Sequence, residues 1–328
     1  MMKKVKRLKA ASIIAFVMAI VFGIDHGNGN IKTKHFVFPC GLVKQSVAPA
    51  KVFEQDVIKY KDKYYMLSET RMPYKSDKSK DMDYFILTLF AIAKEAKKRD
   101  INIYGKEIVL SIGLPPADFS AYADSFTKYF KDNAKNGITF SYNDVAISCY
   151  LKAVYIAPQN FAAVMTYESK LIKEYNTVYC IDIGDGTVDL LVLKNGMPDL
   201  KTRVSNKSGI AVMRSEIANA VQQNFGYQLD GDVIEQILRD KKTVLPQEII
   251  EFVKAQAETW FTKIVNELHP YVPDFRINLT VFLGGGSLIL KKYIEASEEF
   301  GLKEFIEDIK ANAIGYQIIA EKKEENSR

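Results

Sequence analysis

The chain reads Ile24-Asp25-His26-Gly27-Asn28-Gly29 near its start, and 157 residues later it reads Ile181-Asp182-Ile183-Gly184-Asp185-Gly186. Each copy follows an apolar run and leads into another apolar or alternating segment, a pattern that predicts a strand, a tight turn and a returning strand. Glycines in such a turn let backbone N–H groups approach an anion, and an aspartate at the end of a strand can hold a hydrated cation. Two facing copies would bind a metal-bound polyphosphate between them.

Size and composition predict a folded protein of about two domains. The chain has 328 residues, of which 48% are hydrophobic and 26% charged. The net charge of +5 is spread over mixed acidic and basic segments, so no direct binding of nucleic acid is expected. The charged run at residues 75–81 predicts a solvated loop. The three cysteines are widely spaced and the three histidines are few, which argues against a zinc site or a Ser-His-Asp triad.

The N-terminus resembles a secretory signal, because a basic segment precedes an apolar run at residues 10–24. The run is shorter than the roughly 20 residues that a membrane-spanning helix needs. Its last residues also form the strand that carries Asp25. We therefore expect a cytoplasmic protein without a membrane partner, in which residues 1–17 are an extension and Met18 is the native start. A tether at the membrane surface is the alternative.

Hydrophobic periodicity predicts two α/β halves, each of which opens on one of the glycine turns. In the first half we expect strands at 20–24, 31–38, 57–60, 63–67, 107–112, 138–142 and 145–156, and helices at 83–99, from near 117, and at 161–175. In the second half we expect strands at 178–183, 188–194 and 279–283, a hairpin turn at 195–196, and helices at 209–225, 246–268 and around 311–316. A cleft between the halves follows from this repeat.

Single motifs in this set are weak evidence. Walker A needs a glycine directly before its lysine, and here Ile31 precedes Lys32. Lys32 could lean over the hairpin toward a phosphate, or could simply face solvent. The triple glycine 284–286 after a buried strand suggests close approach of backbone to a ligand or to a helix. Gln159, in a first helical turn, could orient a water molecule for attack on a phosphate, or could be an ordinary polar residue there.

Taken in order, the motifs resemble those of the actin, Hsp70 and hexokinase superfamily. They are Asp25-x-Gly27-x-Gly29-x-x-Lys32, Gly113-Leu114-Pro115, Pro158-Gln159, Asp182-x-Gly184-Asp185-Gly186-Thr187-x-Asp189, Gly284-Gly285-Gly286 and Ala311-Asn312-Ala313-x-Gly315. The compact length and the Gly-Leu-Pro segment look most like the plasmid-segregation actins of the ParM/StbA type. The resemblance implies an α/β, actin-like (ribonuclease H-like) fold with the nucleotide between two domains. Domain I would comprise residues 18–170 plus 309–328, and domain II residues 171–308.

The resemblance also implies an ATPase that uses ATP/ADP and Mg²⁺. Asp25 and Asp182 would hold the metal through water, and Gln159 would position the attacking water, so that these three residues form the catalytic set. Residues near 208–216 would line the adenine and ribose. The other nucleotide-binding residues implied are Gly27, Asn28, Gly29, Asn30, Lys32, Gly184, Asp185, Gly186, Thr187, Gly284, Gly285, Gly286 and Ser287.

The function implied is a homopolymeric filament that assembles with ATP, disassembles after hydrolysis and segregates plasmid DNA through a DNA-binding adaptor protein. A monomeric small-molecule kinase of the same superfamily is an alternative. Such a kinase needs a carboxylate base near the acceptor hydroxyl, and the glutamine at position 159 favours water as the acceptor. A cell-shape or division actin remains a further alternative.

Overall fold

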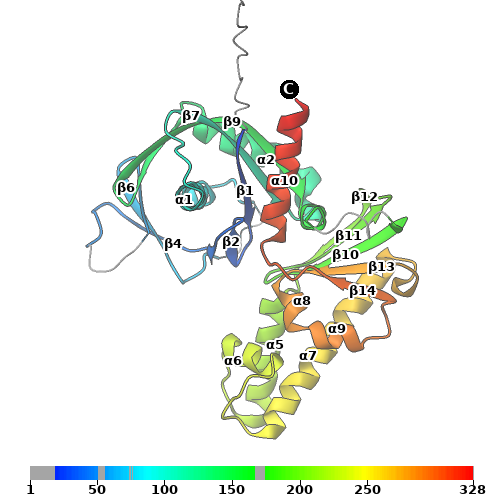
Figure 1. Ribbon diagram of the computed structural model, residues 1–328. Coiled ribbons are helices and arrows are strands. Elements are labelled where there is room, and N and C mark those ends of the chain that lie inside the picture. Colours follow the sequence, from blue (N-terminus) through cyan, green and yellow to red (C-terminus); the bar gives the residue numbers. More distant parts are fainter. Residues whose placement is uncertain (1–18, 51–55, 74, 76, 167–173, 328) are drawn as a thin grey trace, which may run out of the picture.

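The computed structural model describes residues 19–50, 56–73, 75, 77–166 and 174–327. These residues form two β-sheets, each associated with its own helices (Figure 1). The expected N-terminal extension lies outside the described residues. Within the described residues, no helix combines the length and the apolar character needed to cross a membrane.

The first sheet has nine strands in the order β3-β2-β1-β7-β9-β8-β5-β6-β4. It curves around helix α1, whose apolar side chains are almost all buried (Figure 1). Phe130 of helix α2 packs against Phe85 of α1 in the same core. The elements are β1 (Ile20–His26), β2 (Asn30–Lys32), β3 (Val37–Pro39), β4 (Leu42–Gln45), β5 (Val57–Tyr60), β6 (Lys63–Leu67), α1 (Asp83–Lys98), β7 (Lys106–Leu114), α2 (Pro116–Ala134), β8 (Ile138–Tyr142) and β9 (Val145–Pro158).

The second sheet has five strands in the order β12-β11-β10-β13-β14. Its strands are β10 (Thr177–Ile183), β11 (Val188–Lys194), β12 (Met197–Asn206), β13 (Leu279–Leu283) and β14 (Leu302–Phe305). One face is covered by helices α5 (Ile210–Phe225), α6 (Gly231–Leu238), α7 (Gln247–Leu268), α8 (Gly285–Ile289) and α9 (Lys291–Ala296), with short 3₁₀ turns at His269–Tyr271 and Phe275–Ile277 (Figure 1). Buried side chains of the short helix α3 (Phe161–Val164) join a separate core on this sheet.

The two sheets repeat one arrangement. Strand β1 pairs antiparallel with β2 and parallel with β7, and β10 pairs in the same way with β11 and β13. Asp25 and Asp182 therefore occupy equivalent places near the ends of the first strands. Asp25 is paired in register with Lys32, whereas Asp182 is paired with Asp189. The expected two-domain α/β fold is confirmed.

The last helix, α10 (Ala311–Asn326), returns to the first sheet and lies against β1, β7 and α3. It approaches α3 closely at Gly315, where a Cβ atom would stand 1.7 Å from the backbone oxygen of Ala162. The backbones of α10 and α3 are therefore in direct contact, which only glycine permits at this position. This crossing fixes α10 next to the residues that join the two sheets.

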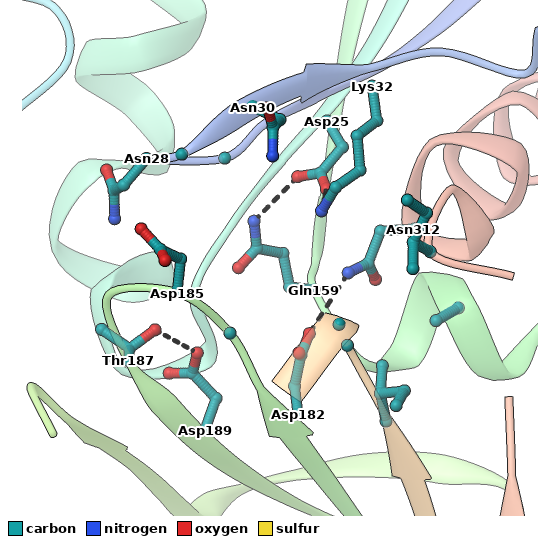
Figure 2. Close-up of a pocket in the computed structure, with 18 of the residues that line it drawn as sticks. Asp25, Asn28, Asn30, Lys32, Gln159, Asp182, Asp185, Thr187, Asp189 and Asn312 are labelled. Carbon is teal, nitrogen blue, oxygen red and sulfur yellow. Dashed lines mark hydrogen bonds and ion pairs between the residues drawn. The ribbon is translucent and has the colours of Figure 1, made fainter. Parts of the chain in front are cut away.

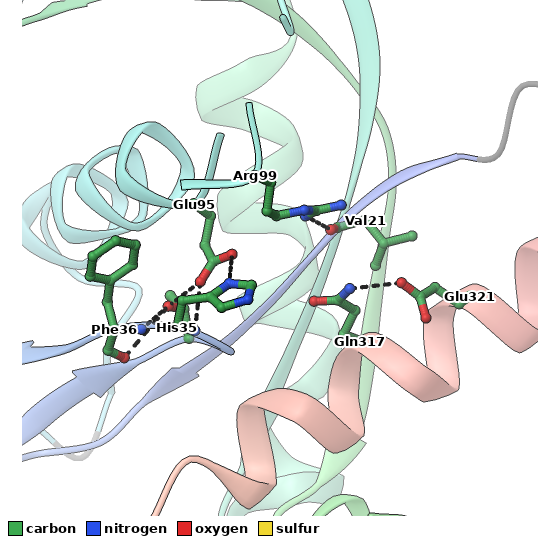
Figure 3. Close-up of polar contacts among 8 residues, drawn as sticks. Val21, His35, Phe36, Glu95, Arg99, Gln317 and Glu321 are labelled. Atoms are coloured by element: carbon green, nitrogen blue, oxygen red, sulfur yellow. Dashed lines mark hydrogen bonds and ion pairs between the residues drawn. The ribbon is translucent and has the colours of Figure 1, made fainter. Parts of the chain in front are cut away.

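One expected strand, 31–38, is wrong as a continuous element. The structure breaks it into β2 and β3 at a turn in which Thr33 N donates to Phe36 O at 2.8 Å. The buried carboxylate of Glu95 on α1 holds this turn, accepting from Thr33 Oγ1 at 2.6 Å, His35 N at 2.9 Å and His35 Nδ1 at 2.8 Å (Figure 3). A carboxylate from α1 thus satisfies polar groups that a straight strand would have paired elsewhere.

Figure 3 also shows how the end of α1 holds β1. Arg99, which caps α1, donates from Nη1 to the backbone oxygen of Val21 at 2.8 Å. On the other side of β1, Gln317 and Glu321 are hydrogen-bonded to each other along α10 at 2.7 Å. The strand that carries Asp25 is therefore held near its start by the side chain of Arg99, at the end of α1.

We expect Glu95→Gln to lower the free energy of unfolding by about 2 kcal/mol at neutral pH, because hydrogen bonds to a buried charge are lost. Burial works against the charge, but the hydrogen bonds from Thr33 and His35 outweigh it and hold the pKa of Glu95 below its ordinary value of 4.5. A depressed folded pKa contributes stability that is present above the unfolded pKa and lost as the pH falls through the folded one. Urea unfolding at pH 7 and below pH 4.5 should show that the difference in unfolding free energy between the unmodified protein and Glu95→Gln becomes smaller at the lower pH. The exposed Glu298→Gln is the control, and an equal difference at both pH values would contradict the assignment.

Other differences concern short elements. The expected helix at 161–175 is described only as α3, which ends at Val164, and residues 167–173 lie outside the described part. Strands β4 and β14 and helices α6 and α9 were not predicted. Helix α6 has eight residues and begins at Gly231, and the side chain of its N-cap, Asp230, accepts from Val233 N at 2.9 Å. A helix of about two turns gives little periodicity to detect.

Candidate functional site

A cleft lies between the two sheets, where the two glycine turns face each other (Figure 2). All but two of the residues expected at the site line this cleft. They are Asp25, Gly27, Asn28, Gly29, Asn30, Lys32, Gln159, Asp182, Gly184, Asp185, Gly186, Thr187, Gly284 and Gly285. The lining also includes Lys78, Pro115, Ala163, Asp189, Leu283, Asp308, Ile309, Ala311 and Asn312.

The first turn presents a carboxylate that is almost fully buried. Asp25 is 2% exposed, and it accepts from Lys32 Nζ at 3.3 Å and from Gln159 Nε2 at 3.0 Å (Figure 2). Burial disfavours the ammonium of Lys32, but the nearby carboxylates, Asp25 first, outweigh this and raise its pKa. The lysine is therefore held charged in the lining of the cleft, where it can attract an anion.

The next residue along β1, His26, takes no part in the cleft wall. It is fully buried, its Nε2 lies 2.7 Å from Thr88 Oγ1, and its ring packs edge-on against Tyr84 and Phe126. Strand alternation explains the difference, since Asp25 and His26 point to opposite faces. Burial lowers the pKa of His26 to about 3, so the imidazole is neutral and belongs to the core.

The two strands that flank the second turn each carry a carboxylate in the cleft. Asp182 is 8% exposed and accepts from Asn312 Nδ2 at 3.4 Å, while Asp189 accepts from Thr187 Oγ1 at 2.8 Å (Figure 2). Burial raises the pKa of Asp182 to about 6, and burial together with the charge of Asp182 raises the pKa of Asp189 to about 7. Burial makes the negative charges of these two carboxylates unfavourable, and a bound cation would offset that cost.

Asp185 of the second turn links the two halves of the molecule. It accepts from Arg214 Nη2 of α5 at 2.7 Å and lies 3.4 Å from Nη1 of Arg71, which follows β6 in the first half. Arg214 also donates to Glu235 of α6 at 2.6 Å. Arg214 lies within the 208–216 segment expected near the nucleotide, whereas sequence reasoning missed Arg71, which stands in no recognisable motif. Together with Asn30 and Ser215, these side chains line a second cavity next to the cleft.

Gln159 and Asn160 form the junction where β9 ends. Gln159 Nε2 faces Asp25, so its side-chain oxygen is turned away from that carboxylate. Asn160 has a positive φ of 63° and donates from its backbone N to Asn312 Oδ1 at 3.0 Å, and its side chain donates to the backbone oxygen of Asp189 at 3.2 Å. This residue therefore ties β9 to both α10 and the second sheet.

The third glycine segment only partly borders the cleft. Gly284 has a φ of 86°, and a Cβ atom there would lie 2.2 Å from Asp182 Oδ1, so glycine is required for both reasons. Gly285 also lines the cleft. Gly286 and Ser287 lie behind the wall: Gly286 packs against Ile183, and the buried Ser287 donates to the backbone oxygen of Gly284 at 2.8 Å.

The expectation of a solvated loop at 75–81 is wrong for Lys78. This lysine is 7% exposed and lines the cleft. Its burial depends on contacts with Tyr84 and with the backbone of His26, and no local periodicity in a charged run could reveal such contacts.

The donor set suits a magnesium ion that keeps much of its own water. No group of three or more His, Cys, Asp or Glu side chains that could hold a metal directly exists among the described residues. Asp25 and Asp182 nevertheless face one cleft, and the buried side-chain oxygen of Asn28 has no protein partner within the described part. Mg²⁺ is commonly bound through one or two carboxylates together with substrate phosphates. The residues that line the cleft are therefore compatible with a hydrated Mg²⁺ ion bound together with phosphates.

Two family models match this chain. The N-terminal domain of actin-like proteins matches residues 23–161, and the C-terminal domain of archaeal MreB-like actin homologues matches residues 180–296. The two models together take in both glycine turns and most of both sheets. No curated protein matches the chain significantly.

Solved structures of actin-like proteins share the fold across nearly the whole chain. The archaeal actin homologue Ta0583 has 17% identity and a TM-score of 0.74, covering 93% of this chain and 99% of its own. Apo ParM of pSK41 has 14% identity and a TM-score of 0.71, covering 94% and 99%. ParM of a 15-stranded filament from Clostridium botulinum has 18% identity and a TM-score of 0.71, covering 93% and 99%. At these identities the likeness establishes the fold.

Proposed function

Because the chain belongs to the actin-like proteins, we propose that it binds and hydrolyses ATP and assembles into dynamic filaments that segregate plasmid DNA. One observation carries the proposal: two Asp-x-Gly-x-Gly turns from repeated sheets face each other across a single cleft, with a buried aspartate on each side. Backbone N–H groups of both turns can surround phosphates there. The division into domain I (18–170 plus 309–328) and domain II (171–308) is part of this proposal.

The nucleotide would lie with its phosphates between the two turns and its base toward the second cavity. Lys32 supplies a positive charge beside the phosphates, and Gly284 and Gly285 let backbone approach closely. Arg214 and Ser215, which fall within the 208–216 segment expected at the adenine and ribose, line the second cavity. That cavity meets the cleft at Asn30. An ADP complex of the archaeal homologue supports nucleotide binding by this fold.

Asp25 and Asp182 would hold a hydrated Mg²⁺, which neutralises phosphate charge when bound. Gln159 is the residue placed to orient water. Its Nε2 donates to Asp25, so the side-chain oxygen is the atom that can accept a hydrogen bond from an attacking water molecule and orient it. A glutamine performs this task in other nucleotide hydrolases.

Filament assembly and partners are inferred from relatives. The Clostridium botulinum ParM and Alp12 structures are filaments, which supports self-association of the same fold. The net charge of +5 is spread over mixed acidic and basic segments of the sequence, which favours a separate adaptor protein that connects the filament to plasmid DNA. A cytoplasmic location is consistent with this role.

The test is light scattering combined with phosphate release on the purified full chain. With Mg-ATP we expect scattering that rises and then decays as phosphate appears, and with ATP plus excess EDTA we expect neither. Absence of polymer at every protein concentration, together with ADP release stimulated by a sugar or another small acceptor, would overturn the proposal in favour of a kinase.

A further inference from the structure

Lys78 is a buried cation in the cleft wall. It lies in the connection between β6 and α1 and is 7% exposed, in contrast to its exposed neighbour Lys80. Lysine side chains are almost never fully buried unless they are paired. Burial lowers the pKa of Lys78, since the ammonium loses hydration. The charges of Asp25 and Asp118 act in the opposite direction and favour the ammonium, but they do not outweigh the effect of burial.

The contacts of Lys78 within the protein do not fully satisfy its ammonium. Nζ donates to the backbone oxygen of His26 and lies 5.4 Å from the centre of the Tyr84 ring. Among the described residues no carboxylate oxygen lies within ion-pair distance of it. An ammonium has three donors, so an anion in the cleft can accept from those not directed at His26.

The position of Lys78 complements that of Lys32. His26 stands between Asp25 and Gly27, so its carbonyl oxygen marks the start of the first glycine turn. Lys32 faces the same turn from its returning strand, where Asp25 already neutralises it at 3.3 Å. Lys78 approaches from a different segment and brings a charge that no aspartate cancels by direct contact in the described structure.

We propose that Lys78 is a second phosphate-binding cation, which contacts the phosphate chain of the nucleotide held in the first glycine turn. The proposal rests on the function proposed above, because it assumes a nucleotide in this cleft. It also brings Lys78, which precedes α1 and belongs to no sequence motif, into the nucleotide site.

A purely structural role makes different predictions. If Lys78 only fastened its segment to β1, replacing it would lower stability in the absence of nucleotide. If it binds phosphate, replacement removes a buried charge that is costly without its ligand, and the unliganded protein keeps its stability or gains some. Nucleotide affinity and unliganded stability therefore separate the two roles.

The experiment compares the full-length protein with Lys78→Met, which keeps the length of the side chain and removes its charge. Affinities for ADP, a non-hydrolysable ATP analogue and adenosine are measured by calorimetric titration, and thermal melting is followed without nucleotide. We expect at least a tenfold loss of affinity for both phosphorylated ligands, unchanged adenosine binding and an unliganded melting temperature that is equal or higher.

Lys80→Met is the matched control, because it removes an exposed lysine of the same segment, and it should leave all affinities unchanged. Unaltered ADP and ATP-analogue affinity in Lys78→Met, or a parallel loss of adenosine binding, would overturn the proposal. Failure of the unmodified protein to bind any nucleotide would instead overturn the proposed function.

Discussion

Replacing Gln159 with alanine is expected to slow ATP hydrolysis by about two orders of magnitude while leaving ATP binding and filament assembly intact. The side chain is buried at the end of β9, and its Nε2 donates to Asp25 at 3.0 Å. That hydrogen bond fixes the amide so that its oxygen faces elsewhere, as an acceptor for water. Alanine removes the acceptor and leaves the glycine turns and Lys32 in place. Filaments of the variant should therefore form with ATP and persist.

Phosphate release and light scattering recorded together test this expectation. Gln222→Ala, which removes an exposed glutamine from α5, is the control and should hydrolyse ATP at the normal rate. Because Gln159 also touches Asp25, the affinity for Mg-ATP must be measured in the variant as well. Normal phosphate release by Gln159→Ala, with ATP binding retained, would show that another group positions the water.

The sequence predicts the elements whose signals are local. Strands β5, β6 and β8 match their expected bounds exactly in residue number, since each is a short β-rich run enclosed by turn residues. The strand expected at 31–38 fails because the carboxylate that bends it comes from Glu95, some 60 residues away along the chain. Helix α6 is missed because eight residues give too few turns to show a period.

The same distinction applies to the candidate site. The repeated turn allowed the residues on both sides of the cleft to be predicted, because each copy carries its own glycines and aspartate. Arg71 and Lys78 could not be predicted in the same way. Arg71 meets Asp185 across 114 positions of the chain, and Lys78 meets His26 across 52. Such contacts arise when distant segments pack together, and residue type and spacing do not encode them locally.

Gly315→Ala is expected to destabilise the protein by about 3 kcal/mol or more, because overpacking at a rigid contact cannot be relieved by a rotamer change. The added Cβ would lie 1.7 Å from the backbone oxygen of Ala162 and 3.0 Å from its Cα. Both obstacles are backbone atoms of α3, so α10 as a whole would have to move away. Asn312, on the same helix, would then lose its contacts with Asn160 and Asp182.

The melting temperature should accordingly fall by roughly 10 °C, with reduced nucleotide affinity in the protein that remains folded. Gly285→Ala is the control for stability, since a Cβ atom there meets nothing within 4 Å and glycine at that helical position confers no advantage in the folded state. An unchanged melting temperature in Gly315→Ala would show that α10 and α3 can separate without cost. The close crossing would then not be what holds the cleft residues of the two sheets together.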